Sequence, residues 1–576
     1  MRVVYRNGGG DEMAEDDDSA TFQSTLEIHG ATHQVKLTPT HIFWENIYNR
    51  QPTKSSQEEP LFRHFAYCVP VKEILCVNPT YGTSYTEDLN QDQRSHGSPV
   101  YIEMRPLKPQ SFTLSYVKRS SRFKWKVKTI TFTSKEAYLC QQWVFRIRNA
   151  IDKLGLSRPE SLLVFVNPYG GKRRGPKIYS EKVAPLFEQA GIRTDVIITQ
   201  RQNHARDIIQ TYDLSRVDGV ICVGGDGMFA ELFNGLIDRK NRELGLPQCK
   251  DQVPASTDLR IGIIPAGSTD AVVYTTIGTN DPVTSALHII VGDSIGLDVA
   301  GVYSAEQLIR YNVTMLSYGY YGDMLKDSEK NRWMGPKRYH VSGVKKFLSN
   351  KSYEGEVSLL LAPDADTSPR DKTVCVSGCN ECRLSQIRDE DRIPTRNMSA
   401  SSSSGPGTDG WHRIRGKIKV LSSFTMSCRN ALTPYGMAPG AHLGDGTTDL
   451  MIISDCSRAN FLKHLLRCQD KNADHFDFDF VQVFRVKEFR FRSLHDQSED
   501  EEDGSRAAGI TRTNHSQGNV LNPKVSLWNC DGEILETTNL HIKIHCQLIK
   551  IFARGIEENE QPVQCPSCCT SCETDS

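Results

Sequence analysis

The chain has 576 residues with 69 Lys and Arg against 70 Asp and Glu, a length that suggests two to four domains of about 150 residues each. Its 38% hydrophobic and 24% charged residues exclude a disordered chain, and its near-zero net charge excludes binding to nucleic acid through overall charge. Because no segment approaches the ~20 apolar residues of a membrane span and the start is acidic, unlike a secretory signal, we expect a soluble, cytoplasmic protein whose 17 cysteines are mostly reduced.

Segments poor in large apolar residues divide the chain. Residues 1–20 are acidic and Gly-rich, and residues 80–99, 384–410 and 495–522 are rich in Ser, Asp, Asn or Gly, which predicts linkers or disordered insertions. The expected parts are a disordered start at 1–20, domains at 21–154, 157–300 and 301–556 (the last with insertions at 384–410 and 495–522), and a Cys-bearing tail at 557–576.

The N-terminal block combines short β-rich runs with one closing helix. The runs that favour strands are Thr25–Ile28, Gln34–Leu37, His41–Trp44, Val71–Val77, Phe112–Val117 and Trp125–Phe132. A helical pattern follows at Ser134–Ile151, with Trp143 on its apolar face. Several strands closed by a helix with a buried Trp resemble a pleckstrin homology domain.

A basic cluster lies between the last two of these strands. It contains Lys118, Arg119, Arg122, Lys124, Lys126 and Lys128, without an acidic residue among them. Such a cluster could bind an inositol lipid headgroup or an anionic membrane surface, at ~1 kcal/mol per charge. A solvated hairpin is the alternative interpretation.

The central block alternates strands and helices. In chain order the pattern predicts a strand at Leu162–Val166, a helix at Lys177–Ala190, a strand at Thr194–Thr199, a helix at His204–Tyr212, a strand at Gly219–Val223, a helix through Phe229 to Ile237 and a strand at Ile261–Ile264. This order predicts a parallel sheet with helices on both faces. Ligands of such sheets bind beyond the carboxyl ends of the strands.

Loops rich in glycine or small polar residues follow these strands. They are Asn167-Pro168-Tyr169-Gly170-Gly171-Lys172, Thr199-Gln200-Arg201-Gln202-Asn203, Gly224-Gly225-Asp226-Gly227 and Pro265-Ala266-Gly267-Ser268-Thr269-Asp270. We expect all four loops to converge on one edge of the sheet. Glycines let the backbone approach a phosphate, and the helix after each loop adds a positive dipole end. Neither a P-loop nor a G-x-G-x-x-G fingerprint occurs, which argues against a P-loop kinase and a usual dinucleotide dehydrogenase.

Asp226 places a carboxylate beside these phosphate-binding amides, at the start of a predicted helix. It could accept a proton from an attacking hydroxyl or help to hold Mg²⁺. A carboxylate that caps its own helix is the alternative interpretation. Glu231 lies five residues further along the same helix.

The glycine motifs resemble those of the lipid kinases of the diacylglycerol kinase catalytic-domain superfamily, which includes the sphingosine kinases. The resemblance covers about Ser161 to Gly555, and stretches such as IPAGSTDAVVYTTIGTND and SLWNCDGEIL are similar to the ceramide kinases within it. It implies a Rossmann-like α/β nucleotide domain and a C-terminal β-sandwich with the active site in the cleft between them. The implied reaction transfers the γ-phosphoryl group of ATP to the primary hydroxyl of ceramide, with Mg²⁺ as cofactor and Ca²⁺ as a candidate regulator.

The resemblance also assigns roles to single residues. It implies Asp226 as the general base and Gly224 to Gly227 as a substrate loop. It implies nucleotide contacts from Asn167, Pro168, Tyr169, Gly170, Gly171, Thr199, Gln200, Arg201, Gln202, Asn203, Glu231, Gly267, Ser268, Thr269, Arg332, Arg338, Asp531, Gly532 and Glu533, with Asp226 and Asp531 as candidate Mg²⁺ ligands. Two positions depart from the family pattern, because sphingosine kinases carry Glu where this chain has Gln200 and the third phosphate loop usually has Asn where this chain has Asp270.

Asp323 matches the lipid headgroup pocket of the sphingosine kinases. Two residues later those enzymes carry an Asp that pairs with the sphingosine amine, and this chain has Leu325. Ceramide has a neutral amide at that place, so a buried carboxylate there would lose its partner. A kinase for sphingosine or diacylglycerol, or a ceramide-kinase-like lipid-binding protein without turnover, are the alternatives.

The C-terminal block contains several further features. Its expected strands are Glu356–Leu361, Lys417–Phe424, Leu450–Ile453, Val481–Phe491 and Leu540–Cys546. The Cys375-x3-Cys379-x2-Cys382 motif, characteristic of ceramide kinases, suggests three ligands of a zinc ion, with a fourth such as Cys428, a structural cluster of reduced thiols, or a redox role. The basic amphipathic segment Phe461–Arg467, after the expected cap Ser457, could bind calmodulin or be an ordinary surface helix.

Overall fold

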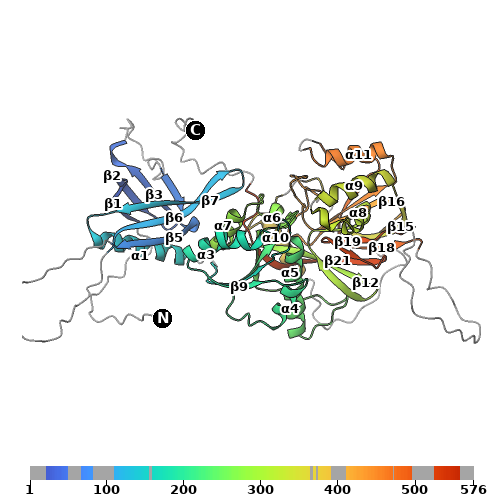
Figure 1. Cartoon of the computed structure of the whole chain (residues 1–576), viewed down its shortest axis with the longest axis horizontal. Coiled ribbons are helices and arrows are strands. Elements are labelled where there is room, and N and C mark those ends of the chain that lie inside the picture. Colours follow the sequence, from blue (N-terminus) through green and yellow to red (C-terminus); the bar gives the residue numbers. More distant parts are fainter. Residues whose placement is uncertain are drawn as a thin grey trace, which may run out of the picture. The chain divides into compact units, whose positions relative to one another are not determined.

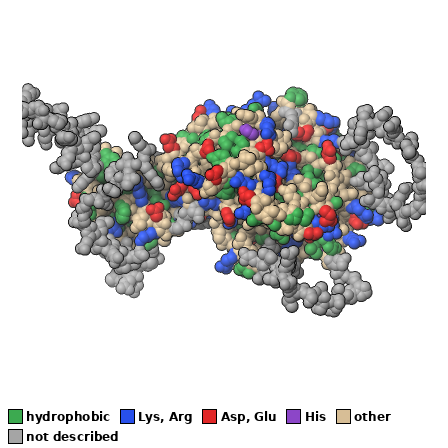
Figure 2. Space-filling view, turned by 90° about the horizontal axis from the view of Figure 1, so that it is seen from below, with side chains coloured by type: hydrophobic (Ala, Val, Ile, Leu, Met, Phe, Trp, Pro, Cys, Tyr) green, Lys and Arg blue, Asp and Glu red, His purple; other side chains and the backbone are tan. Residues whose placement is uncertain are grey.

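The computed structural model describes the chain in ten ranges: 21–49, 67–81, 109–154, 158–335, 337–362, 368–371, 374–390, 410–470, 473–495 and 525–557. The predicted disordered start at 1–20, most of the insertions and all but Glu557 of the Cys-bearing tail lie outside these ranges. Within them, no helix is long and apolar enough to cross a membrane. Basic and acidic side chains are interspersed on the face shown in Figure 2, as the near-zero net charge leads one to expect.

The N-terminal unit is a seven-stranded sheet in the order β4-β3-β2-β1-β7-β6-β5 (Figure 1). Its strands are β1 (Phe22–Ile28), β2 (Ala31–Leu37), β3 (His41–Asn46), β4 (Tyr67–Pro70), β5 (Ile74–Tyr81), β6 (Pro109–Ser121) and β7 (Lys124–Thr133). The predicted strand at Val71–Val77 begins instead with a 3-10 turn, η2 (Val71–Glu73). The His29-Gly30 turn, with both residues at positive φ, closes the first hairpin as a two-residue connection requires.

Helix α1 (Ala137–Lys153) closes this unit and packs against β5. Trp143 is fully buried in the core, and its Nε1–H donates to Oγ of Ser24 at 2.9 Å. Its ring lies against Phe22 and Phe112. A buried Trp with its polar group satisfied therefore anchors the helix to the sheet, as the helical spacing predicted.

The second compact unit contains the predicted parallel sheet, in the order β11-β10-β8-β9. The strands are β8 (Ser161–Val166), β9 (Arg193–Ile198), β10 (Gly219–Gly224) and β11 (Arg260–Pro265), paired in parallel. The connecting helices are α2 (Gly175–Ile178), α3 (Ala184–Gln189), α4 (His204–Thr211), α5 (Asp226–Glu243), α6 (Ala271–Thr276) and α7 (Pro282–Val291). A π turn, η3 (Tyr179–Val183), interrupts the predicted helix at Lys177–Ala190.

The C-terminal half is rich in antiparallel strands that continue this sheet. They are β12 (Ser294–Ser304), β13 (Gln307–Asn312), β14 (Met315–Gly319), β15 (Tyr353–Leu361), β16 (Trp411–Phe424), β17 (Thr448–Ser454), β18 (Val481–Ser493), β19 (Trp528–Cys530), β20 (Glu533–Leu535) and β21 (Leu540–Phe552). Strand β21 joins the two halves, because it pairs in parallel with β11 and antiparallel with β12 and β18. The predicted domain boundary at residue 300 consequently lies inside strand β12.

Four longer helices accompany these strands: α8 (Tyr320–Glu329), α9 (Lys337–Ser349), α10 (Asn380–Glu390) and α11 (Arg458–Arg467). Figure 1 shows α8 and α9 side by side near β16. Helix α10 covers residues that were predicted to open a disordered insertion at 384, so that part of the prediction was wrong. The cap predicted at Ser457 is present, since its Oγ accepts from the backbone N–H of Asn460 at 3.2 Å.

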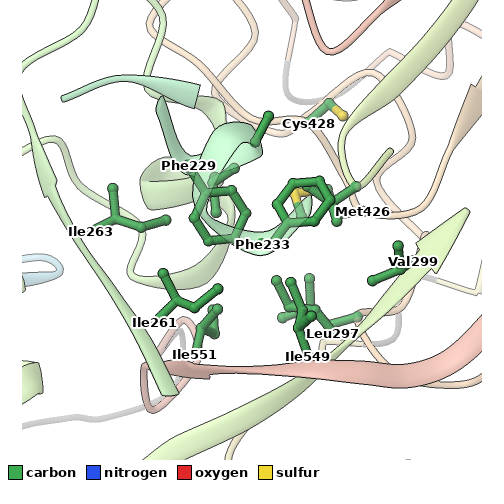
Figure 3. Close-up of a cluster of buried hydrophobic side chains, with 14 of the residues drawn as sticks. Phe229, Phe233, Ile261, Ile263, Leu297, Val299, Met426, Cys428, Ile549 and Ile551 are labelled. Carbon is green, nitrogen blue, oxygen red and sulfur yellow. The ribbon is translucent and has the colours of Figure 1, made fainter. Parts of the chain in front are cut away.

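Helix α5 packs against the parallel strands β10 and β11 and the antiparallel strand β13. Figure 3 shows Phe229 and Phe233 of α5 directed toward the isoleucines of β11 and β21, with Met426 and Cys428 nearby. Both phenylalanines are fully buried. Each buried aromatic side chain of this size contributes about 1.5–3 kcal/mol through apolar burial. The position of the first residue of α5, Asp226, is therefore fixed by the core behind it.

Candidate active site

Three of the predicted glycine loops pack against one another at the carboxyl ends of the parallel strands. A Cβ atom added at Gly171 would lie 2.5 Å from the carbonyl oxygen of Ala266, and one added at Gly225 would lie 2.9 Å from Cα of Gly267. Gly171 also has a positive φ of 55°. Glycine is required at these positions because the backbones touch directly. The prediction that these loops converge on one edge is confirmed for these three.

The first loop is held by the side chain of Asn167. Its Oδ1 accepts from the backbone N–H of Tyr169 at 2.8 Å and of Gly170 at 3.0 Å, while its own backbone N–H donates to Val223 of β10. This is a turn stabilised by an Asn side chain. Tyr169 stands 63% exposed at its tip. The loop is thus rigid at its base and presents an aromatic ring to solvent.

Asp226 is the first residue of α5, and its carboxylate binds a different helix. Its Oδ2 accepts from the backbone N–H of Ala271 and its Oδ1 from that of Val272, each at 3.0 Å. It therefore caps α6, and the interpretation of a cap on its own helix is wrong. Burial raises the pKa of Asp226 above its usual value, the two amides oppose this, and the charge of Asp531 adds to the rise. A fixed carboxylate with a raised pKa is a suitable general base.

Asp270 provides a second carboxylate close to Asp226. Only 2% of the residue is exposed, its Oδ1 accepts from the backbone N–H of Gly267, and its Oδ2 accepts from Nδ2 of Asn280, both at 2.9 Å. Burial and the neighbouring Asp226 raise its pKa to about 7. The sequence marked Asp270 only as a departure from the family's Asn and gave it no role. The sequence signal that could have found this role is the position of Asp270 three residues after Gly267, within reach of the backbone of the same loop.

The turn Asp531-Gly532-Glu533 returns to the same region between β19 and β20. The carboxylate of Asp531 accepts from the backbone N–H of Val313 at 3.0 Å and of Thr314 at 2.9 Å, and also from the Thr314 hydroxyl. Burial raises its pKa, opposed by the Thr314 hydroxyl and by Arg310. The charge of Asp531 raises the pKa of Asp226, so this turn lies close to the start of α5.

Arg310 is a basic residue that the sequence interpretation missed. It forms an ion pair with Glu533 and its charge also acts on Asp531. No motif marks it, because it is a single Arg within strand β13. The turn thus combines two carboxylates with one partly buried guanidinium.

The second loop, from Thr199 to Asn203, is tied to its neighbours. Thr199 donates from its backbone N–H and its hydroxyl to the carbonyl of Val166, at 2.9 and 3.3 Å. Asn203 has a positive φ of 61° and precedes α4. Burial raises the pKa of Glu231, against hydrogen bonds from the backbone of Asn203 and Ala205, and Glu533 adds to the rise. Glu231 therefore links this loop to α5. Arg201 instead forms an exposed ion pair with Asp207 at 2.7 Å.

The predicted lipid-site residues lie in α8. Asp323 accepts from the hydroxyls of Ser526, at 2.8 Å, and of Tyr353, and it lines a pocket with Tyr320, Phe347, Lys419 and Phe461 among others. Leu325 is buried with 3% exposure. None of the hydrogen bonds described for Asp323 involves the glycine loops.

The two predicted phosphate-binding arginines lie near the start of α9. Arg338 pairs with Glu329 at 3.4 Å and donates to the Tyr339 hydroxyl at 2.7 Å. The side chain of Arg332 lies outside the described part of the chain. Arg338 thus makes local contacts around α8 and α9 in this structure.

The predicted cysteine motif is brought together. Ligand atoms of Cys375, Cys379, Cys382 and His442 all lie within 4.8 Å of one another. Cys428, the suggested fourth ligand, lies elsewhere, since its thiol is affected by the charges of Asp531 and Asp226. The suggestion that Cys428 is the fourth ligand was wrong. The fourth residue of the group is His442, from the loop before β17, which lies far from the cysteines in sequence. All 13 cysteines in the described ranges are free thiols, as expected.

Comparisons with known families fit this fold and site. Residues 161–302 match the model of the diacylglycerol kinase catalytic domain, which contains the glycine loops and Asp226. Residues 22–147 match the ceramide kinase PH domain, and residues 314–569 match the ceramide kinase C-terminal domain. The fold and site are therefore those of the lipid kinases with this catalytic domain.

Comparison with individual proteins narrows the family to which the chain is assigned. The chain is 45% identical to ceramide kinase from Homo sapiens over 505 residues, covering 86% of this chain and 90% of the relative, and 44% identical to ceramide kinase from Mus musculus, covering 78% and 85%. A solved putative diacylglycerol kinase from Bacillus anthracis is 15% identical with a TM-score of 0.42, over 69% of this chain and 97% of that structure. The chain belongs to the ceramide kinase family.

Proposed function

We propose that the chain is an ATP-dependent kinase that phosphorylates the primary hydroxyl of ceramide to give ceramide 1-phosphate. The observation that carries this is the position of Asp226. Its carboxylate stands where Gly225 touches Gly267 and is fixed by the backbone N–H groups of Ala271 and Val272. Membership of the ceramide kinase family supports the choice of substrate.

The chain's own residues would act mainly by positioning and by moving one proton. The first and third glycine loops would hold the phosphates, and Pro168, Ser268 and Thr269 would line them. Asn167 and Gly267 would shape these loops, because their own backbone N–H groups already donate to Val223 and Asp270. Asp226 would take the proton of the lipid hydroxyl, because the two amides occupy one lone pair on each oxygen and leave others free. Arg332 and Arg338 would stabilise charge on the transferred phosphoryl group; for Arg338 this requires release from Glu329.

The carboxylates suit a divalent cation. Asp270 and Asp531 are buried and Asp226 is partly buried. Removal from solvent raises the pKa of all three, and the charge of one neighbouring Asp adds to the rise in both Asp226 and Asp270. Several carboxylate oxygen donors close together fit Mg²⁺. Asp226 and Asp531 would hold the ion, which would neutralise phosphate charge when bound. Ca²⁺ as a regulator rests on the family resemblance alone.

Leu325 supports ceramide over sphingosine. A buried leucine suits a neutral amide, whereas an ammonium group would require a charged partner there. Turnover of radiolabelled ATP with ceramide, sphingosine and diacylglycerol tests this choice, and we expect ceramide to be phosphorylated fastest. Leu325→Asp should lower ceramide turnover more than the neutral Leu325→Asn does. Preference of the unaltered enzyme for sphingosine or diacylglycerol, or no turnover of any lipid, would exclude the proposed reaction.

The basic cluster of the N-terminal unit would bring the enzyme to an anionic or phosphoinositide membrane, at ~1 kcal/mol per charge. Arg119 is bound to Glu73 through two contacts of 2.9 and 3.0 Å, so its charge is partly neutralised. Burial and the positive charges of Lys118 and Lys126 lower the pKa of Lys128, so these three lysines lie close together. The enzyme would be cytoplasmic and bound peripherally to membranes.

Helix α9 would provide a second membrane contact. Val341, Val344 and Leu348 are 46%, 60% and 58% exposed, and Trp333 just before the helix is 83% exposed. The buried residues of α9 are instead the small Ser342 and Gly343. An exposed apolar stripe flanked by lysines, with an exposed Trp, suits the interface of a bilayer that contains ceramide.

A double variant tests this contact. Val344→Glu with Leu348→Glu should lower turnover of long-chain ceramide in vesicles about tenfold or more, because acidic side chains oppose insertion. Turnover of a short-chain ceramide in solution should change little. Val253→Glu, at a 61% exposed valine elsewhere, is the matched control. Equal losses with both substrates would contradict a membrane role.

Calmodulin binding by α11 receives little support. Phe461 and His464 of this helix are buried against the domain, while Leu462 and Leu466 are about half exposed. A calmodulin complex would require the Phe461 face to leave the core. The ordinary surface helix remains the simpler interpretation.

A further inference from the structure

Four side chains that commonly bind metals meet in the C-terminal half, away from the carboxylates of the proposed active site. Cys375, Cys379 and Cys382 belong to the segment 374–390, and His442 belongs to the loop before β17. Cys375 and His442 are buried, with 6% and 3% exposure. Two segments about 60 residues apart in sequence thus contribute to one cluster.

The distances fit a tetrahedral ion. The Sγ atoms of Cys375 and Cys382 are 3.5 Å apart, and Sγ of Cys379 lies 3.4 Å from Nε2 of His442. Zinc bonds of about 2.3 Å to sulfur and 2.0 Å to nitrogen separate tetrahedral ligands by roughly 3.5–3.8 Å. A disulfide would need sulfur atoms about 2.05 Å apart, and these cysteines are free. We propose that Cys375, Cys379, Cys382 and His442 bind one structural zinc ion.

Helix α10 needs such an anchor. It starts at Asn380, within the cysteine motif, and Ser385 is the one fully buried side chain among those described for it. Its Ile387 is 51% exposed. A helix that buries so little apolar surface gains little from packing. A metal bound at its first turn would fix it to the rest of the domain.

The surroundings of the cluster are already connected by hydrogen bonds. The side-chain amide of Gln547 donates to the carbonyl oxygens of Cys382, at 2.7 Å, and of Gly444, at 2.9 Å. The segment is further attached where the backbone N–H of Ser377 donates to the carbonyl of Arg554 at 2.9 Å. Gln547 therefore holds the two ligand-bearing segments together beside β21, as outer partners of metal sites do.

Metal binding requires a rearrangement of protons. The backbone N–H of Gly444 donates to Nδ1 of His442 at 3.1 Å, which leaves the ring proton on Nε2, facing Cys379. On binding, the three thiol protons pass to solvent and the ring proton moves to Nδ1. The Gly444 amide must then turn away from the ring. Glycines at 444 and 446 make this loop able to do so.

The site also borders the element that Asp226 caps. Cys375 lines a small pocket with Thr275 of α6, Ala441 and Leu443. The Thr275 hydroxyl accepts from the backbone N–H of Arg429 at 3.0 Å. Loss of the ion would weaken the packing of the Cys375 segment beside Thr275 of α6. The first backbone amides of α6 hold Asp226. The zinc ion would thus support the catalytic carboxylate indirectly.

Metal analysis of the full chain tests the proposal. Protein purified under reducing conditions without chelator should contain about one zinc per chain by elemental mass spectrometry, and a strong chelator should remove it and lower the thermal midpoint. Cys379→Ser and His442→Ala should each lose most of the zinc. His442→Cys should keep it, since four thiolates also bind zinc tetrahedrally.

Cys428→Ser is the matched control, because Cys428 is a buried thiol outside the cluster. It should keep zinc at the level of the unaltered chain. Absence of zinc from the folded unaltered chain, or full zinc content in both Cys379→Ser and His442→Ala, would overturn the proposal. If His442→Ala fails to fold, the zinc content of His442→Cys decides, since loss of zinc from that folded variant contradicts the site.

Discussion

Asp226 and Asp531 are held in similar ways but reach the site by different routes. Each carboxylate accepts two backbone N–H groups from another element, from Ala271 and Val272 in one case and from Val313 and Thr314 in the other. Asp226 lies in a glycine motif between a strand and its helix. Asp531 has a positive φ of 48° in a turn more than 300 residues later.

Asp226 is positioned by residues adjacent to it in sequence, whereas Asp531 is positioned by contacts between segments far apart in sequence. The loop of Asp226 is a strand-to-helix connection whose glycines and following helix are adjacent in sequence. The turn of Asp531 is in position only because β19 pairs with β14. The two regions should therefore respond differently to substitution, the first in the chemical step as well as in cation binding and the second in cation binding alone.

Asp226→Asn should have the largest effect. Removing a general base lowers turnover by a factor on the order of 10² to 10⁴, while ATP binding should be largely retained. The measurement is kcat with ceramide, together with nucleotide binding by calorimetry. Turnover close to that of the unaltered chain would remove Asp226 as the base.

Asp531→Asn should have a smaller effect that depends on the cation. Loss of a carboxylate near a metal typically lowers affinity by about 10- to 100-fold, so the Mg²⁺ concentration for half-maximal activity should rise. High Mg²⁺ should restore turnover in this variant but not in Asp226→Asn. If added Mg²⁺ restores neither or both, the proposed division of roles is wrong.

Gly225→Ala should raise the KM for ATP about tenfold, because the new Cβ would meet Cα of Gly267 at 2.9 Å and displace the loops by a few tenths of an ångström. Gly416→Ala is the matched control, since nothing lies within 4 Å of a Cβ there. Steady-state kinetics and thermal unfolding distinguish a local effect from general destabilisation. An unchanged KM would show that close packing of the loops does not position ATP.

Asp270→Asn should have the smallest effect on activity and a clear dependence on pH. The folded-state pKa of Asp270, about 7, exceeds its ordinary value of 3.8. The folded protein therefore keeps a proton that the unfolded chain loses, and stability falls as the pH rises from about 4 to 7. The thermal midpoint of Asp270→Asn, relative to the unaltered chain without Mg²⁺, should consequently increase from pH 5 to pH 8.

The control for this prediction is Asp258→Asn, because the Asp258 side chain is 91% exposed. Its relative thermal midpoint should not depend on pH. Removing the charge of Asp270 should also shift the acid limb of the kcat/KM profile to lower pH, since Asp226 then loses its proton more easily. A shift to higher pH would contradict repulsion between the two carboxylates.

Residues next to one another in sequence were the ones that sequence reasoning placed well. The parallel strands, the helix of Phe229 and Phe233 and the turn of Asn167 follow from periodicity and from glycine positions. Arg310 was missed because it is a single residue without a motif. His442 was not connected with the cysteines because it lies 63 residues from Cys379 in the sequence. The part of α10 from residue 384 onward was taken for disorder because its composition is polar and its contacts come from distant segments.

The sequence by itself determined the alternation of strands and helices, the glycine loops and the carboxylate that starts α5, because these depend on local backbone preferences and on the spacing of apolar residues. Only the tertiary structure decided that β21 joins the parallel and antiparallel strands, that Asp531 returns toward Asp226 and that His442 completes the cysteine cluster. Those contacts join residues tens to hundreds of positions apart, and burial of side chains from both halves of the sheet, rather than any local preference, fixes them.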